Sequence, residues 1–458
     1  MPVKPPSLPN TTILNKELFS CIINVTALRI PAQRTSQLVA ALRGTVLREA
    51  GIKPVIDIPS HSTERMLLLD PDVVREPNVQ TMSQALQQVI AKEGAVVTPY
   101  ELHLTYEDWT FEQVIRSVLP TTMDVPSSFE GVGHIAHFNL RDDYLPYKNL
   151  IGQVLLDKNR HLRTVVNKLD SIDHTFRFFK MEVLAGDDDF MAEVHESNCK
   201  FRFDFSKVYW NSRLQMEHSR LLSFFKPGDI ICDAFAGVGP FAIPAAKNQK
   251  CTVFASDLNP NSYEALAENV QLNKVEDKVA AYNMDAREFF AFSLRELNRA
   301  DLRVSMASKA PKPSVRRSKA QKTSADNSSA PSQIATDAAK KTEESQVETN
   351  GGKLRWFNHY VMNLPAAAVE FLDAFRGLLS EYKDQIPTEK LPIVHCYLFT
   401  KGQEEAEKDA VEMVSKNLGT QLLPSDIIKI HRVRDVSPKK EMFCVSFRLP
   451  ALVAFADK

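Results

Sequence analysis

Cysteine, glycine and long apolar runs are all scarce in this 458-residue chain. Its six cysteines lie far apart and form no Cys-x-x-Cys pair, so we expect neither a disulfide framework nor a metal site. No apolar run approaches the roughly 18 residues of a membrane-spanning helix. The start, MPVKPPSLPN, also lacks the apolar core of a secretory signal. These absences favour a reducing compartment and no membrane partner.

A charge excess of either sign is missing as well, because 56 Lys and Arg balance 57 Asp and Glu. A formal net charge of −1 gives no support for nucleic-acid binding by bulk charge. The basic residues are nevertheless unevenly placed, and they outnumber the acidic ones in 1–50 and 141–180. Basic faces are therefore expected on a globally neutral protein.

Hydrophobic patterning divides the chain into three predicted domains, at 1–95, 96–205 and 206–458. The first two mix strand-like alternation with helical spacing, so both are expected to be small α/β or α+β domains. In the third, apolar stretches such as DIICDAF and TVFASDL alternate with helical ones, which is typical of a parallel sheet covered on both faces. The predicted fold class is α/β, with a Rossmann-like domain last. The expected elements of the first domain are a strand at 17–30, a helix at 33–50 and a strand at 65–70.

Residues 303–352 interrupt the third domain with a segment rich in Ser, Thr, Ala and Lys and without a periodic apolar face. Such a composition predicts a disordered insertion. Its stretch SVRRSKAQK is compatible with a solvated loop, a nuclear-import signal or an RNA-tethering patch, and the sequence leaves these open.

The stretch DAFAGVGPF, at 233–241, follows a predicted buried strand and opens a helix. Gly237 and Gly239 allow the backbone to turn sharply and to approach a ligand closely. Dinucleotide folds need a third glycine, and Ala242 stands in its place. The short loop, with no pyrophosphate to hold, favours S-adenosylmethionine over NAD. The loop residues predicted to bind this cofactor are Asp233, Phe235, Ala236, Gly237 and Gly239.

Acidic residues follow the next two predicted strands. Asp257 lies where a carboxylate can accept both ribose hydroxyls of a nucleoside cofactor. Asp285 ends the next predicted strand, in the stretch AAYNMDA, a position beside the adenine in S-adenosylmethionine enzymes. Each acid alone is equally compatible with an ordinary loop residue or a helix N-cap, but their order at successive strand ends favours a cofactor site.

The stretch HYVMNLP, at 359–365, ends another predicted strand. Pro365 keeps Leu364 out of the helical region, so the turn is expected to be extended. Asn363 offers a carbonyl and an amide at a fixed point, which suits the edge of a planar base. Asn363 and Pro365 are therefore predicted to line a target base, with a simple Asn turn as the alternative.

Six stretches, in this order, resemble the archaeal and eukaryotic tRNA (guanine-N1)-methyltransferases that modify position 37, next to the anticodon: GHIAHFNLR, VVNK, VYWNSRLQMEHSRL, DAFAGVGPF, DLNP and NLP. The resemblance covers about residues 15–450 without the insertion. It implies a class I S-adenosylmethionine methyltransferase domain behind two domains that bind the outer corner and the anticodon stem-loop of tRNA. Ser212 departs from the proline of many relatives, which is a loop detail.

The resemblance also implies roles for single residues. Cofactor contacts map onto His218, Asp257, Leu258, Asp285, Ala286 and Asn363. Residues that handle the base map onto Arg177, Tyr209, Glu217 and Asn363. Guanine N1 carries a proton that must leave for the methyl group to bind, so Glu217 is the predicted general base. Arg177 would stabilise charge at O6, and Tyr209 would stack on the splayed base.

Simpler interpretations of these side chains stay open. Arg213, Glu217 and Arg220 share one helical face, so Glu217 has arginines within ion-pair reach. His218 shares its face with leucines and is compatible with a core histidine. Arg177 is compatible with an arginine at a strand edge.

Three alternatives also stay open for the function. They are the aminocarboxypropyl transferase of the wybutosine pathway, a non-catalytic RNA-binding protein with a vestigial fold, and a methyltransferase acting on another base or on protein. FAGVGPF and DLNP favour the methyltransferase. We expect a monomer that binds tRNA and also starts wybutosine synthesis on tRNA-Phe. Its expected location is the cytoplasm and nucleus, with the mitochondrial matrix possible.

Overall fold

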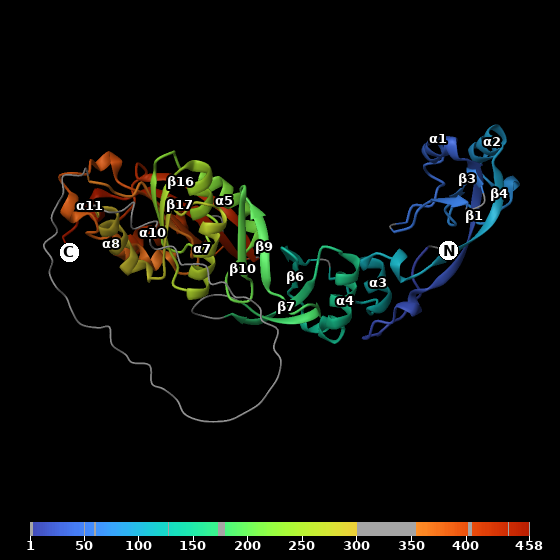
Figure 1. Ribbon diagram of the computed structural model, residues 1–458, viewed down its shortest axis with the longest axis horizontal. Helices are drawn as coiled ribbons and strands as arrows, with labels where there is room; N and C mark the ends of the chain where they lie inside the picture. The colour runs from blue at the N-terminus through green and yellow to red at the C-terminus, as the bar shows by residue number, and fades with distance from the viewer. Residues whose placement is uncertain are drawn as a thin grey trace, which may run out of the picture. The chain divides into compact units, whose positions relative to one another are not determined.

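The computed structural model describes residues 3–49, 51–58, 61–126, 128–172, 179–299, 354–401, 405–437 and 439–457. The chain divides into two compact units, Met1–Ala192 and Glu193–Lys458 (Figure 1). The predicted insertion at 303–352 and the predicted site residue Arg177 lie outside the described residues.

The first sheet of the amino-terminal unit is antiparallel, with the order β2-β3-β1-β4. Its elements are β1 (Cys21–Pro31), α1 (Thr35–Ala41), β2 (Val55–Ile58), β3 (His61–Leu68), α2 (Gln84–Glu93) and β4 (Val96–Leu104). Helix α2 begins where the Ser83 side chain accepts a hydrogen bond from the Leu86 N–H. It ends at Gly94, whose φ of 64° is left-handed. Both ends of the helix are therefore set by local sequence.

Two features of this sheet differ from the sequence expectations. The predicted helix at 33–50 stops at Ala41, because Val46 forms a β-bridge with Leu69. Strand β4 follows the predicted domain boundary at 95, yet it pairs with β1 from Val96 to Leu104. These hydrogen bonds place 96–104 in the first sheet, and the division into three domains stays a prediction.

The second sheet of this unit has the order β5-β6-β7-β8. Its elements are α3 (Phe111–Val118), β5 (Glu130–Val132), β6 (Ile135–Phe138), α4 (Lys148–Lys158), β7 (Thr164–Ile172) and β8 (Phe179–Gly186). Helix α4 connects β6 to β7, which run parallel. Gly152 lets α4 approach β8 closely, because a Cβ there would lie 2.6 Å from the Leu184 Cβ. Short 3-10 helices lie at η1 (Lys16–Phe19), η2 (Ala32–Arg34), η3 (Val79–Thr81), η4 (Tyr106–Asp108) and η5 (Asp142–Tyr147).

The carboxyl-terminal unit is built on a seven-stranded sheet with the order β13-β12-β11-β14-β15-β17-β16. The strands are β11 (Ile230–Asp233), β12 (Thr252–Ser256), β13 (Val279–Tyr282), β14 (His359–Met362), β15 (Ile393–Thr400), β16 (Ile427–Ser437) and β17 (Lys440–Arg448). The first five in this order run parallel, and β17 is antiparallel to both of its neighbours. The predicted parallel α/β domain is confirmed.

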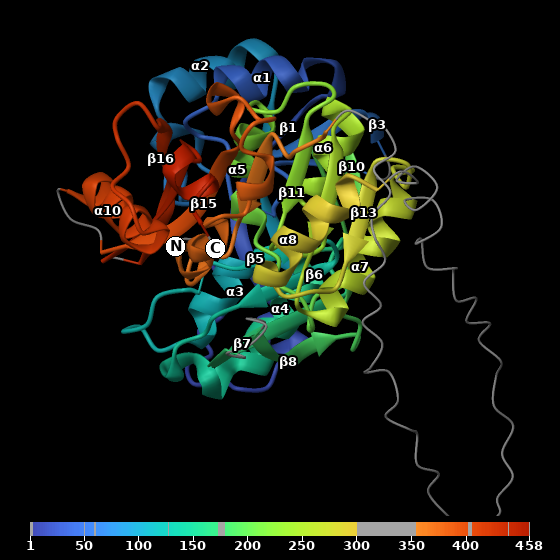
Figure 2. The ribbon, with the colours of Figure 1, turned by 90° about the vertical axis from the view of Figure 1, so that its left-hand side faces the viewer.

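Helices cover both faces of this sheet (Figures 1 and 2). They are α5 (Gln215–Leu222), α6 (Ala242–Gln249), α7 (Pro260–Leu272), α8 (Ala286–Leu297), α10 (Ala406–Leu418) and α11 (Ala451–Ala454), with η6 (Ser212–Leu214), η7 (Ala368–Phe375), η8 (Ser380–Tyr382) and η9 (Thr388–Lys390). Strands β9 (Met191–Glu196) and β10 (Cys199–Asp204) form a separate two-stranded sheet, which comes before these helices in the chain.

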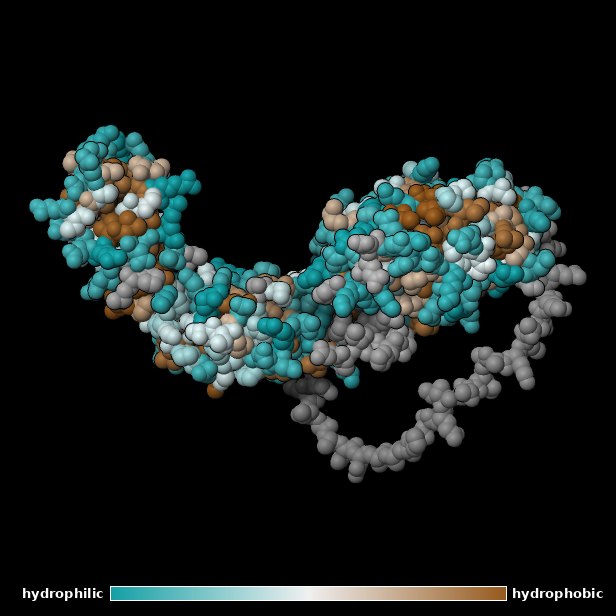
Figure 3. Space-filling view, turned by 180° about the vertical axis from the view of Figure 1, so that it is seen from behind, coloured by the Kyte–Doolittle hydropathy of each residue, from teal (hydrophilic) through white to brown (hydrophobic). Residues whose placement is uncertain are grey.

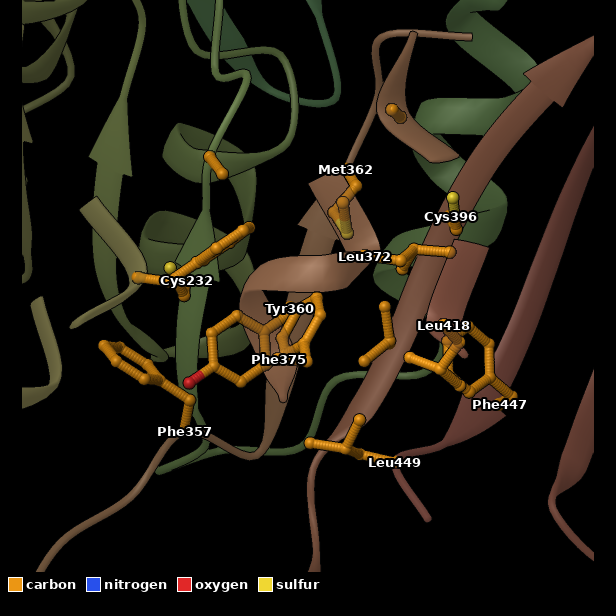
Figure 4. Close-up of a cluster of buried hydrophobic side chains, with 14 of the residues drawn as sticks. Cys232, Phe357, Tyr360, Met362, Leu372, Phe375, Cys396, Leu418, Phe447 and Leu449 are labelled. Carbon is orange, nitrogen blue, oxygen red and sulfur yellow. The ribbon is translucent and has the colours of Figure 1, made fainter. Parts of the chain in front are cut away.

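Side chains alternate between the two faces of the sheet, as β geometry requires. Cys396 of β15 faces the core that η7 and α10 cover (Figure 4), and Leu398 belongs to the same core. Tyr360 and Phe375 meet edge-on in this core, with ring centroids 4.9 Å apart. Tyr397 of β15 points to the opposite face, where it contacts α5. Strand β15 thus contributes side chains to the core on one face of the sheet and to the candidate site on the other.

The face seen in Figure 3 is mostly hydrophilic, with apolar side chains among the polar ones. Met216 and Ile13 are among the exposed apolar residues. None of the helices in the described ranges is long and apolar enough to cross a bilayer. Within the same ranges, no cluster of three or more His, Cys, Asp or Glu side chains is placed to hold a metal ion.

Candidate active site

Polar side chains gather at the carboxyl ends of four neighbouring parallel strands. Asp233 ends β11, Asp257 follows β12, Asp285 follows β13 and Asn363 follows β14. Because the strands are parallel neighbours, all four positions lie at one edge of the sheet. In open α/β sheets, ligands bind at this edge, where the strand order reverses. The structure therefore brings together the four residues that the sequence analysis placed at strand ends.

The glycine loop between β11 and α6 needs both of its glycines. Gly237 and Gly239 have φ values of 54° and 99°. A Cβ at Gly239 would lie 2.7 Å from the Ile243 Cδ1 and 2.8 Å from the Leu266 Cδ1, so a side chain does not fit. A Cβ at Gly237 would meet no atom within 4 Å. The loop is thus packed tightly against α6 and α7 at Gly239 and leaves open space at Gly237.

Asp257 holds the glycine loop in place. Its carboxylate accepts hydrogen bonds from the Gly237 N–H, at 2.8 Å, and from the Asn259 N–H, at 2.9 Å. Each bond uses a different oxygen. Because a carboxylate offers about four lone pairs, each oxygen keeps one for a ligand hydroxyl. The predicted ribose contact and the observed loop contacts are therefore compatible.

Asp233 is fully buried, and neither of its carboxylate oxygens makes a hydrogen bond within the described structure. Burial raises the pKa of Asp233 to about 8, the backbone N–H of Phe235 acts in the opposite direction, and the charge of Asp257 adds a smaller increase. Buried carboxyl groups without a partner are uncommon in proteins. Such a group points to a ligand with a donor or a positive charge near the loop.

Asp285 caps the helix that follows it. Its side chain accepts a hydrogen bond from the Arg287 N–H at 2.9 Å, and Ala286 is the buried first residue of α8. Asp285 is thus the N-cap of α8, and its second carboxylate oxygen can still accept a hydrogen bond from a ligand.

Asn283 was missed by the sequence analysis. Its amide donates to the carbonyls of Asp257, at 2.7 Å, and Leu258, at 3.0 Å, which ties the two strand-end loops together. The Leu258 side chain is exposed beside this link. The only sequence signal for Asn283 was its place directly after a strand.

Asn363 has a buried side-chain oxygen that no described group satisfies. The turn around it is fixed by other contacts, because the carbonyl of Pro365 accepts a hydrogen bond from the Phe399 N–H at 3.2 Å. A simple Asn turn would use the side-chain oxygen locally. The unsatisfied oxygen instead favours a contact with a ligand donor.

His218 lies in the core next to the glycine loop. Its Nδ1 lies 2.5 Å from the Glu196 Oε1, and its ring meets Phe241 edge-on at 4.8 Å. Phe241 is the last residue of the DAFAGVGPF stretch. The core interpretation of His218 is therefore observed, and its predicted cofactor contact is untested. Glu196 gave no local sequence signal.

Tyr209 and Trp210 begin the segment that leads into α5. Trp210 packs against Phe201 and Phe203 of β10, with ring centroids 5.6 and 5.1 Å away, and so anchors the segment. Tyr209 is 48% exposed, and its hydroxyl accepts a hydrogen bond from the Asn211 amide. An exposed ring held next to an anchored one is compatible with the predicted stacking on a base.

Glu217 lies on α5 and is buried. Its carboxylate accepts two hydrogen bonds from Arg220, at 2.6 and 2.7 Å, and one from the Tyr397 hydroxyl at 2.7 Å. The ion pair with Arg220, which the helical spacing suggested as the simpler interpretation, is thus formed. Tyr397 and the neighbouring His431 were missed, because both come from strands far away in the sequence.

Comparison with known proteins identifies relatives along the whole chain. A family model described as the TRM5/TYW2 methyltransferase domain matches residues 192–309, and one described as the TYW2 N-terminal domain matches residues 111–189. The tRNA (guanine(37)-N(1))-methyltransferase of Batrachochytrium dendrobatidis is 44% identical over 99% of this chain and 92% of its own. That of Homo sapiens is 39% identical over 99% of this chain and 79% of its own.

Solved structures agree in fold. Trm5b from Pyrococcus abyssi has a TM-score of 0.55, with 18% identity over 93% of this chain and 99% of that chain. The complex of aTrm5 and tRNALeu gives a TM-score of 0.57, with 18% identity over 92% of this chain and 99% of that chain. At this identity the likeness concerns the fold alone.

Proposed function

We propose, from the premise that this chain belongs to the family of tRNA (guanine(37)-N(1))-methyltransferases, that it methylates N1 of guanosine 37 in tRNA. The observation that carries the proposal is the similarity to enzymes of that name along nearly the whole chain. The polar cluster at the strand ends supplies a matching site in a fold of the expected class.

S-adenosylmethionine fits the residues at the strand ends. Asp257 would accept the ribose hydroxyls, and Leu258, Asp285 and Ala286 would border the adenine. The unpartnered carboxyl of Asp233 and the open space at Gly237 would receive the charged methionine end. When bound, this cofactor supplies the electron-poor methyl group that N1 takes.

Glu217 would accept the proton of guanine N1, Arg177 would stabilise the charge at O6, and Tyr209 would stack on the splayed base. Support for this assignment is the burial of Glu217, which lets a carboxylate act without competition from water. General-base catalysis typically contributes about 10²–10⁴-fold to a rate. Asn363, whose side-chain oxygen lacks a partner, would donate or accept at the edge of the base.

The partner would be tRNA, held at its outer corner by residues 1–95 and at the anticodon stem-loop by residues 96–205, by a monomeric enzyme. On tRNA-Phe the same reaction would be the first step of wybutosine synthesis. The cytoplasm and nucleus, and also the mitochondrial matrix, are the proposed locations.

A second function has one observation in its favour, because a TYW2 N-terminal model matches residues 111–189. The alternative is transfer of an aminocarboxypropyl group to a modified guanosine. To decide, the protein is incubated with S-adenosylmethionine and unmodified tRNA transcripts bearing G or A at position 37. We expect one added methyl group on the G transcript alone. A larger added mass would favour the alternative, and equal methylation of both transcripts would contradict guanosine 37 as the target.

A further inference from the structure

Three side chains form a row on the face of the sheet that α5 covers. Tyr397 of β15 lies directly opposite Cys444 of β17, and Cys444 lies directly opposite His431 of β16. Residues that face each other across antiparallel strands project to the same side of the sheet. Because Tyr397 contacts Glu217, Cys444 and His431 lie on the same side of the sheet as the Glu217 carboxylate.

The carboxylate of Glu217 meets this row. Its Oε1 accepts from the Arg220 Nη2, at 2.6 Å, and from the Tyr397 Oη, at 2.7 Å. Its Oε2 accepts from the Arg220 Nε at 2.7 Å and lies 3.3 Å from the Nε2 of His431. Three hydrogen bonds and the ion-pair contact with His431 thus surround a carboxylate that offers about four lone pairs. A proton arriving from a substrate therefore needs one of these positions to become free.

The four contacts differ in how easily they open. Tyr397 is fully buried, and its hydroxyl would lose its partner inside the core. Arg220 is 20% exposed, stacks on the Phe224 ring and would leave a charge unpaired. His431 has the longest contact, is 34% exposed and lies on the edge strand of the sheet, so its ring can turn toward water. The His431 position is therefore the one that a ligand can take over at the smallest cost.

We propose that His431 occupies the acceptor position of Glu217 that the N1–H of the target guanine takes over, and that protonation of His431 keeps this position closed. The inference rests on the proposed role of Glu217 as the general base. His431 is thus a positioning residue, since it contacts the general base Glu217 and not the target guanine. In the neutral form, its ring yields to the guanine. In the charged form, it pairs with Glu217 and competes with the substrate.

The charges around His431 support this behaviour. Burial lowers the pKa of His431 below its usual value, Arg220 and Lys429 act in the same direction, and Glu217 opposes them. The ring is therefore mostly neutral at pH 7 and becomes charged on acidification. Burial raises the pKa of Cys444 to about 12 and holds that of Tyr397 well above its usual range, so neither changes charge between about pH 5 and 8.

The test is the pH dependence of the single-turnover methylation rate of the full chain on saturating tRNA. His431→Asn keeps a neutral polar side chain and cannot be protonated, and His195→Asn is the matched control on an exposed strand position of the same unit. We expect the acidic decline of the rate to move to lower pH in His431→Asn alone, with about the wild-type rate at pH 8. At pH values where His431 is charged in the wild type, the wild-type rate should fall about tenfold further below the His431→Asn rate for each pH unit. Acidic declines that superimpose would overturn the proposal.

A second measurement requires no change at position 431. The ring nitrogens of His431 are titrated by NMR in the wild type and in Glu217→Gln. Because the Glu217 charge favours the protonated ring, the midpoint for His431 should fall in Glu217→Gln. An unchanged midpoint would mean that the two groups are not coupled and would also overturn the proposal. The two proposals fail separately: an unimpaired rate in Glu217→Gln removes the general base, whereas an unshifted profile in His431→Asn removes only the role of His431.

Discussion

Replacement of Glu217 by glutamine tests the chemistry and the packing of the site together. Glutamine keeps the shape of the side chain and can still accept from the Tyr397 hydroxyl, but it loses the charge that pairs with Arg220. A buried hydrogen bond to a charged group, once weakened, costs on the order of 1–3 kcal/mol of folding free energy. Loss of a general base costs about 10²–10⁴-fold in rate, or roughly 3–5 kcal/mol of barrier.

These two effects can be separated. The rate is measured in a single turnover, with enzyme in excess over tRNA, and methylated nucleoside is quantified by mass spectrometry. Cofactor affinity by calorimetry and tRNA affinity by filter binding are expected to stay close to wild type. Glu268→Gln is the matched control, because Glu268 pairs with Arg202 on the surface at 3.4 Å with both side chains 51% exposed. Such a pair contributes only about 0–1 kcal/mol. A folded Glu217→Gln with a rate within a few-fold of the control would refute the general-base assignment.

Three further changes test the cofactor site. Asp257→Ala should weaken S-adenosylmethionine binding by roughly tenfold to a hundredfold, because a charged acceptor is lost. Calorimetry checks this against the control Asp277→Ala, which changes an exposed carboxylate. Equal cofactor affinities of the two variants would count against the ribose contact. Asp233→Asn should stabilise the cofactor-free protein by about 1–4 kcal/mol near pH 8. The raised pKa means that the folded state holds a proton that the unfolded state releases, so this carboxyl lowers stability increasingly from about pH 4 to pH 8. Thermal melts should show a gain at both pH 5.5 and pH 8, larger at pH 8, because the penalty of this carboxyl grows between about pH 4 and pH 8. A gain of equal size at both pH values would contradict the assignment. Gly239→Ala should lower the free energy of unfolding in urea by about 1–3 kcal/mol, and by more than Gly237→Ala does, because only the Cβ at position 239 meets neighbouring atoms. Equal losses in the two variants would contradict the tight packing of the loop at Gly239.

The sequence allowed the strand-end residues to be predicted because their signals are local. A short apolar strand, a turn and a polar residue recur at Asp233, Asp257 and Asn363, and parallel strands necessarily bring such positions to one edge. The glycine loop is equally local, since its conformation depends on residues within one turn. The class of the fold followed from the same alternation of strands and helices.

The surroundings of Glu217 could not be predicted in this way. Tyr397 lies 180 residues further along the chain, and His431 lies beyond it. Their meeting depends on the antiparallel insertion of β17 between β15 and β16, which no local pattern encodes. Helical spacing alone therefore indicated the Arg220 pair and nothing of the other two partners.

The short helix α1 shows the same limit in another form. Its sequence continues with helical spacing beyond Ala41, but the chain turns so that Val46 can pair with Leu69. A tertiary contact thus overrides the local preference. Asn283 and Glu196 also gained their roles only from neighbours that are distant in sequence.

The central claim is tested most directly by the position of the transferred methyl group. Unmodified tRNA with G at position 37 is incubated with the wild-type protein and S-adenosylmethionine carrying a deuterated methyl group, then digested and analysed by tandem mass spectrometry. The account predicts one labelled methyl group, on N1 of guanosine 37. A label on another atom or another nucleotide, or an added aminocarboxypropyl mass, would contradict it.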